Sequence, residues 1–357
     1  MISGLKQRVK KLVLNCPKGL LRQIMVRRRL MSHPNEIEKN IDSFCGASSL
    51  SDAERSGLIS AIRKDMVAHL ITPDEYFLYD FVSKSEAEKS EFVGDMERTI
   101  LCARLYNSNP AGMVFMDKMK TYDHFQPFFK REVIQVANET DRKRFEDFVS
   151  RHGEYMVKPI AASRGEGIRK EVAPRTKEDM RSAFDAILGS GACVIEELID
   201  QDERIGALHP QSVNTIRYAT YYDGGELHTI ACFIKIGRGE SVVDNGGAGG
   251  FLAAVDEATG IITTPGKTEF GEVIEVHPDT QVPIVGFKIP EWDELQKMVR
   301  ELPKVLPEQK YVGWDLALSK TKGWVLVEGN SGGQFVGPQI ATGKGIRNRI
   351  EASFGSL

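Results

Sequence analysis

The chain has 357 residues, of which 41% are hydrophobic and 27% charged, as in ordinary globular proteins. Its 47 basic and 50 acidic residues give a net charge of −3, so the protein as a whole lacks the basic character of a nucleic-acid-binding protein. No run of about eighteen apolar residues is present, and a membrane-spanning helix is therefore not expected. The length predicts two or three lobes, and the sequence leaves the oligomeric state open.

The cysteines are few and widely spaced. Their number is odd and none belongs to a CxxC pair, which favours free thiols in the cytoplasm over a disulfide framework or a zinc site. The five are Cys16, Cys45, Cys102, Cys193 and Cys232.

Basic residues are concentrated at the start of the chain. Nine lysines and arginines lie within residues 1–30, interleaved with apolar residues, and the first acid is Glu36. Such an amphipathic stretch could make a peripheral contact with the anionic inner surface of a membrane, where each basic residue contributes about 1 kcal/mol. The alternative, which we prefer, is a pair of helices packed on the protein with their arginines in water.

Residues 1–110 are expected to be mostly helical. Ser51 and Glu54 form a capping-box pattern that predicts a helix to about Leu70. A second helical run is expected over about 85–107, and the Asn-Ser-Asn-Pro segment at 107–110 is typical of a turn between domains.

After residue 110 the sequence alternates between helical and strand patterns. The expected helices cover 117–129, 141–153, 176–188 and about 291–305. The expected strands cover 132–136, 155–159, 192–197, 213–222, 226–236, 250–256, 285–289, 311–318 and 323–328. The predicted class is α+β, with a helical region over 1–110, a small α/β lobe over 111–190 and a larger strand-rich lobe over 191–357.

The strongest chemical signal lies near the C-terminus. Asp315 follows an apolar strand pattern, and Glu328 and Asn330 end the next one after a short turn. Asp315 and Glu328 can approach each other across such a hairpin, and alternation places Glu328 and Asn330 on one face. These oxygen donors predict a magnesium site in which ATP phosphates supply further ligands. The alternative is a hairpin with solvated acids, but unpaired carboxylates after apolar strands would be costly.

A second signal is Lys158 at the end of an apolar strand, followed by a glycine-bearing loop. Glycines allow backbone N–H groups to approach phosphate oxygens, and the lysine supplies a positive charge. The spacing is neither that of a P-loop nor GxGxxG, and a simple strand-to-turn connection is the alternative. The loop residues expected to contact the nucleotide are Ser163, Arg164, Gly165 and Gly167.

Three further segments complete the pattern. The apolar strand that ends in Glu196 and Glu197 can present backbone groups to adenine and a carboxylate to ribose, although a plain strand end would look the same. Arg217 lies near the start of a strand and could bind phosphate or carboxylate with two N–H groups. The glycine-dense segment 237–250 could hold an intermediate or an acceptor amine, or could be a surface loop.

The order of these features resembles that of the ATP-grasp superfamily over about residues 113–345. The phrases HPQSVNTIRYAT, VVDNGGAGG and VGWDLAL…VLVEGN are most similar to sugar-transfer-associated ATP-grasp proteins, which are implied to act in surface polysaccharide biosynthesis. The resemblance implies an ATP-grasp fold, in which two α/β lobes sandwich ATP, with an additional N-terminal helical region.

The resemblance also implies roles for residues that contact the nucleotide. Lys118 matches the first ATP-contacting lysine, and Lys158 matches the second, which binds the α- and β-phosphates. Glu196 matches the acid on the adenine side, Leu198 a hinge residue that offers its backbone, and Glu203 the acid that binds ribose.

At the reacting end, the resemblance implies that Asp315, Glu328 and Asn330 bind two magnesium ions. Arg217 would contact a phosphate or acyl phosphate. Lys235 would act beside it, at a position where many relatives have arginine, and the glycine loop reads SRGEG instead of a run of glycines.

The implied activity is that of a ligase that uses ATP to activate a small-molecule carboxylate as an acyl phosphate, which an amine then converts into an amide. Surface polysaccharide, related glycan or secondary-metabolite biosynthesis is the implied setting. Two alternatives stay open: a kinase that phosphorylates a sugar hydroxyl, and a non-catalytic ATP-binding scaffold for glycan enzymes. The sequence does not identify the carboxylate or the acceptor.

Overall fold

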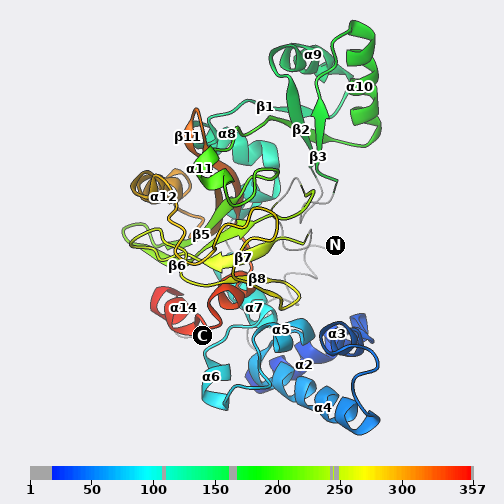
Figure 1. Cartoon of the computed structure of the whole chain (residues 1–357), viewed down its shortest axis with the longest axis vertical. Helices are drawn as coiled ribbons and strands as arrows, with labels where there is room; N and C mark the ends of the chain where they lie inside the picture. Colours follow the sequence, from blue (N-terminus) through cyan, green and yellow to red (C-terminus); the bar gives the residue numbers. More distant parts are fainter. Residues whose placement is uncertain (1–17, 107–109, 161–166, 242–243, 245–248, 355–357) are drawn as a thin grey trace. The chain divides into compact units, whose positions relative to one another are not determined.

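The computed structural model describes residues 18–354 except 107–109, 161–166, 242–243 and 245–248 (Figure 1). The chain forms two compact units. The first, a helical unit, comprises Met1–Ser108, Glu269–Glu272 and Gln334–Leu357, and the second, a sheet unit, comprises Asn109–Thr268 and Val273–Gly333.

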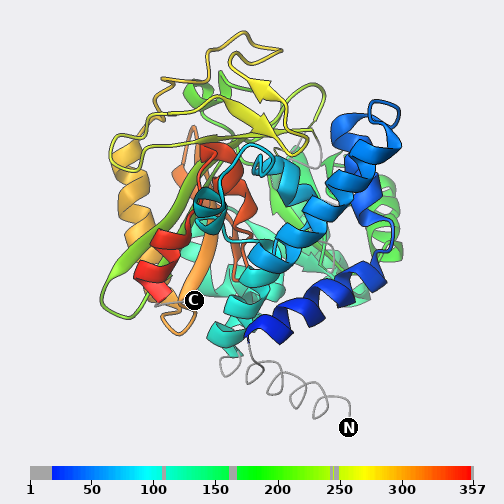
Figure 2. The same ribbon diagram turned by 90° about the horizontal axis from the view of Figure 1, so that it is seen from below.

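Figure 2 shows the helices of the helical unit, several of which begin at a capping box. In the predicted capping box, the Ser51 backbone N–H donates to Glu54 Oε2 at 2.9 Å and the Glu54 N–H donates to Ser51 Oγ at 3.4 Å, which confirms this helix start. The same device begins α5 and α6. The helices are α2 (Lys18–Ser32), α3 (Glu36–Cys45), α4 (Asp52–His69), α5 (Pro73–Leu78), α6 (Glu86–Ser90), α7 (Asp95–Tyr106), α13 (Val336–Thr342) and α14 (Arg347–Phe354).

A buried glutamine fastens the C-terminal segment to the N-terminal helices. Gln339 Nε2 donates to the Val93 carbonyl at 2.9 Å and to the Tyr79 hydroxyl at 3.0 Å, while its Oε1 accepts from the Val93 N–H at 2.8 Å. Ile340 packs beside it in the same hydrophobic core as Ile41. These contacts explain why α13, which the sequence patterns did not predict, belongs to the helical unit.

The sheet unit contains a four-stranded antiparallel sheet in the order β1-β4-β2-β3. Its core contains Phe145 and Phe148 from α9 and Phe184 from α10, so both helices pack on the sheet. The elements are β1 (Val133–Val136), α9 (Arg142–Arg151), β2 (Glu154–Pro159), β3 (Arg169–Val172), α10 (Lys177–Gly189) and β4 (Cys193–Glu197), with a 3-10 turn, η2 (Glu139–Asp141), before α9. β4 therefore belongs with the earlier strands, although the predicted small lobe ends at residue 190.

A seven-stranded antiparallel sheet forms the rest of the sheet unit, in the order β11-β10-β5-β6-β7-β8-β9. Helices α8 and α12 contact it, and Phe125 of α8 lies 5.3 Å from Trp314 of β10, measured between ring centroids. The elements are η1 (Pro110–Met116), α8 (Lys118–Phe129), α11 (Glu203–Gly206), β5 (Thr215–Tyr222), β6 (Leu227–Ile236), β7 (Phe251–Ala254), β8 (Gly266–Thr268), β9 (Val273–Ile274), α12 (Trp292–Val305), β10 (Tyr311–Ser319) and β11 (Gly323–Asn330).

The register of this sheet separates an apolar face from a polar one. Trp314 and Leu316 alternate with Asp315 along β10. The side chains of Trp314 and Leu316 are buried in the hydrophobic core that includes residues of α12. Directly opposite Asp315 lie Glu328 on β11 and Arg217 on β5. The three polar side chains therefore start from neighbouring positions on the other face.

Most long elements occur where the sequence patterns predicted them, but the strand expected over 285–289 is wrong. There, Gly286 has a φ of +86°, and the only pairing in this short segment is an isolated bridge between Lys288 and Ile261. No helix in the described ranges is long and apolar enough to cross a membrane. The four cysteines that are described carry free thiols.

We expect Gly94→Ala to destabilise the helical unit. A Cβ atom at Gly94 would lie 2.2 Å from the Leu70 carbonyl oxygen, which is backbone and cannot rotate away. The expected loss is about 1–3 kcal/mol in the free energy of unfolding, measured by chemical denaturation. Gly57→Ala on α4 is the control, because nothing lies within 4 Å of its Cβ position, and it should be neutral or slightly stabilising. Equal stabilities of the two variants would contradict the close packing at Gly94.

Candidate active site

Asp315 lies at the centre of a buried ionic network on the polar face of the seven-stranded sheet. Arg217 donates two hydrogen bonds to its carboxylate, from Nε to Oδ1 at 2.6 Å and from Nη2 to Oδ2 at 2.8 Å. Lys235 Nζ lies 3.3 Å from Oδ1. A Cβ atom at Gly313, the next residue on this face of β10, would lie 3.3 Å from Arg217 Cδ, so glycine leaves room for the arginine.

The two cations keep Asp315 ionised although it is only 3% exposed. Burial alone would raise the pKa of Asp315, but the charges and hydrogen bonds of Arg217 and Lys235 outweigh burial and hold the pKa below its ordinary value. In turn, Asp315 more than offsets the effect of burial on Arg217, whose pKa is raised. The carboxylate is thus in the charge state that a metal ligand requires.

Asp244 extends the network, and sequence reasoning did not identify it as a site residue. Its Oδ2 accepts from the Thr215 backbone N–H at 3.0 Å and from the Thr215 hydroxyl, and its Oδ1 lies 3.8 Å from Lys235 Nζ. Burial raises the pKa of Asp244 more than Lys235 lowers it. The sequence showed only an aspartate beside a glycine-dense loop, with no signal that it turns inward toward Lys235.

Glu328 and Asn330 are the more accessible members of the predicted metal set. Glu328 is exposed, and its carboxylate forms no hydrogen bond or ion pair with any residue that the structure describes. Asn330 is half-buried and follows two positions later on β11. Two carboxylates and an amide oxygen on one sheet face are suitable magnesium donors, and these residues therefore fit the ion. Such an ion would compete with Arg217 for the Asp315 oxygens.

A second buried ionic cluster lies between the two sheets. Glu196 Oε2 is 2.9 Å from Lys158 Nζ and 2.7 Å from Arg131 Nη2. Burial alone would raise the pKa of Glu196, but the charges of Lys158 and Arg131 prevail and hold the pKa at about 2. The predicted phosphate lysine and adenine-side acid are therefore in contact with each other.

Arg131, which sequence reasoning missed, connects this cluster to the metal-site strand. Its guanidinium donates to the carbonyl of Leu326 and, at 3.3 Å, to that of Val327, both on β11 next to Glu328. No local motif marks this arginine, because its partners lie 65 and about 195 positions away in the sequence. Only the tertiary structure shows its role.

Lys118 approaches the end of the strand that carries Lys158. Its Nζ donates to the carbonyls of Pro159 at 3.3 Å and Ile160 at 3.4 Å. Gly167 has a φ of +70°, where glycine is favoured, and closes the loop after this strand. The other predicted loop contacts, Ser163, Arg164 and Gly165, lie outside the described residues.

Two acidic residues, one at the end of β4 and one beyond it, pair with lysines of the β10–β11 turn. Glu197 pairs with Lys322, and Glu197 Oε2 accepts from the Glu132 backbone N–H at 2.9 Å. Glu203 is exposed and pairs with Lys320. The structure thus leaves the predicted ribose acid accessible, and Leu198 lies half-buried between the two acids.

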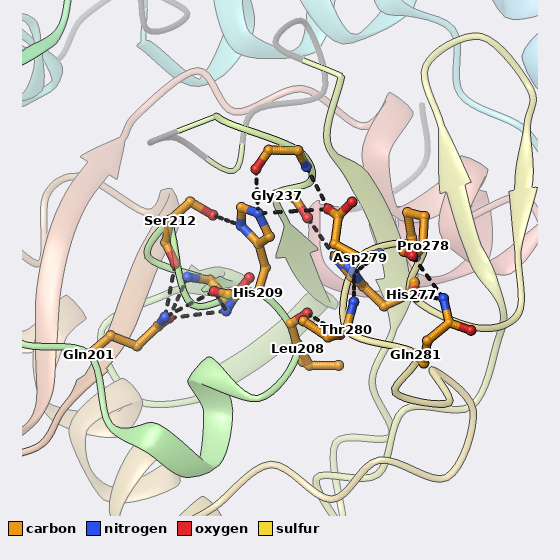
Figure 3. Close-up of polar contacts among 12 residues, drawn as sticks. Gln201, Leu208, His209, Ser212, Gly237, His277, Pro278, Asp279, Thr280 and Gln281 are labelled. Carbon is orange, nitrogen blue, oxygen red and sulfur yellow. Dashed lines mark hydrogen bonds and ion pairs between the residues drawn. The ribbon is translucent and has the colours of Figure 1, made fainter.

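Two buried histidines hold the segment that follows Lys235 (Figure 3). His209 Nε2 donates to the Gly239 carbonyl at 3.0 Å, and His277 Nε2 donates to the Gly237 carbonyl at 2.9 Å. His209 Nδ1 then accepts from the Ser212 hydroxyl at 2.8 Å. A Cβ atom at Gly237 would lie only 2.2 Å from Ser212 Oγ. The glycine-dense segment therefore starts from a fixed position.

Comparison with known protein families identifies the chain. The family model described as sugar-transfer associated ATP-grasp matches residues 98–353, which is most of the sequence and includes every candidate site residue. The chain belongs to the sugar-transfer-associated ATP-grasp family. This confirms the resemblance seen in the sequence phrases. The roles of individual residues in this ATP-grasp protein stay predictions.

Several solved ATP-grasp structures are similar to this family member. One is D-alanyl-alanine synthetase A from Vibrio cholerae, with 12% identity, a TM-score of 0.39, and 69% of this chain and 62% of that chain covered. Another is the ATP-grasp ligase PsnB in complex with a precursor variant, Mg and ADP, with 13% identity, a TM-score of 0.41, and 72% and 68% covered. A third is N5-carboxyaminoimidazole synthetase from Staphylococcus aureus complexed with ADP, with 10% identity, a TM-score of 0.39, and 68% and 52% covered.

At such identities and TM-scores, the family assignment depends on the sequence-family match. The chain spans less than two thirds of the length of the Vibrio cholerae and Staphylococcus aureus proteins. A comparison with curated proteins gave no match.

We expect Glu196→Gln to lower stability at neutral pH by about 3–5 kcal/mol, because it leaves Lys158 and Arg131 buried without their anion. The folded pKa of Glu196, about 2, lies below its ordinary value of 4.5. The stabilisation is therefore complete above about pH 4.5 and is lost as the pH falls toward 2. Chemical denaturation should show that the difference in the free energy of unfolding between wild type and variant decreases as the pH falls through this range.

The control for this prediction is Glu178→Gln, at an exposed position in the first turn of α10. It should change stability little at any pH. A difference between wild type and Glu196→Gln that stayed constant down to low pH would contradict an ionised, buried Glu196.

Proposed function

We propose that the chain is an ATP-dependent carboxylate–amine ligase that forms an amide through an acyl phosphate. The observation that carries this proposal is the polar sheet face, where Arg217 and Lys235 hold the ionised Asp315 beside an accessible Glu328. In an ATP-grasp family member, this combination supports a site that binds the phosphates of ATP and stabilises the transferred phosphoryl group.

ATP would bind along the contacts between the two sheets. Lys158 lies near the end of β2, and Lys118 of α8 reaches the same strand end through its Nζ. Both lysines would contact the phosphates, with Lys158 exchanging its bond to Glu196 for one to a phosphate oxygen. The backbone at Leu198 and the accessible Glu203 carboxylate would bind adenine and ribose. These assignments rest on the family resemblance and on the accessibility of the residues.

Asp315, Glu328 and Asn330 would hold magnesium, which when bound offsets negative charge on the β- and γ-phosphates. We propose two ions, as the resemblance implies. Asp315 supplies an ionised carboxylate whatever the solvent pH in the neutral range, because Arg217 and Lys235 hold its pKa low. Glu328 supplies an exposed carboxylate that forms no hydrogen bond or ion pair with a described residue.

In the reaction, an oxygen of the substrate carboxylate would attack the γ-phosphorus, and ADP would leave. The amine nitrogen would then attack the acyl carbon, the C–N bond would form, and inorganic phosphate would leave as the amine lost a proton. Arg217 and Lys235 would stabilise the charge on the transferred group from fixed positions, since buried ionic contacts already orient both side chains.

The family description supports a sugar-related substrate, and we propose a role in surface polysaccharide, related glycan or secondary-metabolite synthesis. Mass spectrometry of products formed with ATP, magnesium and a panel of amino acids, amino sugars and uronic acids would identify the carboxylate and the amine substrate. A ligase releases free phosphate and yields an amide. A phosphorylated sugar would instead indicate a kinase, and absence of ATP turnover with every substrate would favour a scaffold.

We expect Glu328→Gln to reduce ATP turnover by about 100-fold or more, because it removes an anionic metal ligand that would act on the transferring phosphoryl group. The fold should be retained, since Glu328 is exposed and forms no hydrogen bond or ion pair with a described residue. Release of ADP and the thermal unfolding temperature are the two measurements.

The matched control is Glu226→Gln, which removes an exposed glutamate from the β5–β6 turn of the same sheet. It should turn over ATP at the wild-type rate. Near-normal turnover by Glu328→Gln would rule out the metal assignment, whereas a similar loss in both variants would point to a general effect of charge.

A further inference from the structure

Helix α2 (Lys18–Ser32) presents an apolar stripe to solvent. Leu20 is 51% exposed, Ile24 48% and Met31 74%. They occupy positions i, i+4 and i+11, which at 3.6 residues per turn fall within about 40° of one another around the helix axis. Three large apolar side chains on one exposed face of a single helix indicate a surface that binds a membrane or another protein.

This stripe is separate from the face that packs α2 onto the helical unit. Leu21 and Val26 are buried, and Val26 lies in the core of the unit. Arg22 donates to the Ala68 carbonyl on α4, and Arg29 binds Glu36 through Nε at 2.9 Å. The packing predicted as the alternative for the basic N-terminal stretch is therefore present for α2. It does not use the exposed stripe.

The charge of the exposed face is entirely positive. Arg27 and Arg28, at positions i+7 and i+8, flank the apolar stripe on its two sides. Both are exposed, and neither has a hydrogen bond or ion pair with a residue in the described part of the chain. Helix α2 contains no acidic residue, and Arg63 of the adjacent α4 is also exposed.

An open, mainly apolar groove of about 380 Å³ runs beside the stripe. Val26 and Leu30 of α2 and Val67 of α4 line it, together with one arginine from each helix, Arg27 and Arg63. Apolar side chains flanked by arginines can bind a surface that has an anionic outer layer over an apolar interior. The aliphatic part of each arginine can lie on the apolar region while its guanidinium contacts the anions.

We propose that this α2 face docks the protein on an anionic phospholipid membrane. The stripe and the groove would contact the acyl region just below the headgroups, and Arg27, Arg28 and Arg63 would pair with lipid phosphates. A bilayer matches the charge of this face, which offers positive charge along a helix about 22 Å long and no acid to repel anionic lipid. Such docking would hold the protein at a membrane surface.

Vesicle flotation of the full chain tests the proposal. The protein should float with vesicles that contain phosphatidylglycerol and should stay unbound with pure phosphatidylcholine. Raising the salt concentration should weaken binding, because exposed charges are screened. Failure to float with the anionic vesicles, or equal binding to both kinds, would overturn the proposal.

Two pairs of variants locate the contact. Arg27→Gln with Arg28→Gln should reduce partitioning into anionic vesicles on the order of tenfold or more. The control, Arg175→Gln with Lys177→Gln, removes the same charge from two exposed positions at the N-terminal end of α10 and should bind within about twofold of the wild-type chain. Equal losses in the two pairs, or no loss in the first, would overturn the assignment to α2.

The apolar part of the contact is tested in the same way. Ile24→Ser with Met31→Ser should also reduce binding on the order of tenfold or more, because it removes apolar surface from the membrane contact. The control, Val82→Ser with Val172→Ser, alters two other exposed apolar residues and should leave binding unchanged. Full binding by the Ile24 and Met31 variant would overturn insertion of this face. All variants should have wild-type unfolding temperatures.

Discussion

The carboxylate of Asp315 is buried in a sheet, where an isolated charge would be prohibitively costly. Arg217 and Lys235 offset that cost, and they reach Asp315 only because β10, β5 and β6 pair in one register. A slip of one residue would turn Asp315 into the apolar core and Trp314 toward the polar side. The ionic network and the strand register therefore depend on each other, which makes this sheet both a framework and a site.

The apolar side of the same strands supports this arrangement. All nine residues of β10 are buried, and Trp314 packs against Phe125 of α8 and Phe115 of η1. These aromatic contacts fix β10 on its apolar face, opposite the face that carries Asp315. The two buried histidines, His209 and His277, give similar support to the chain after Lys235. Rigid placement of charges of this kind is what electrostatic catalysis requires.

Much of this arrangement could be predicted from local sequence. Apolar alternation and a short turn predicted that Asp315 and Glu328 face each other across a hairpin, and the register confirms that pairing. Patterns with a period of two or 3.6 residues also located most of the long helices and strands.

The parts that could not be predicted depend on contacts between distant segments. Arg131 contacts Glu196 and β11 only in the folded protein, and Asp244 joins the ionic network only because the fold places it beside Lys235. The strand expected at 285–289 had suitable apolar residues but a glycine with positive φ. Helix α13 is short and contains glycine and proline, so its formation depends on the burial of its side chains and not on helix propensity.

The cluster around Glu196 contains two cations and one anion, Arg131 and Lys158 against a single carboxylate. With Arg131 also hydrogen-bonded to strand β11, Glu196 can remain neutralised even when Lys158 turns away. The protein thus keeps one positive charge in excess at a poorly hydrated position, where a charge attracts an incoming anion more strongly than it would in water. If Lys158 released Glu196, Arg131 and Glu196 would still form an ion pair.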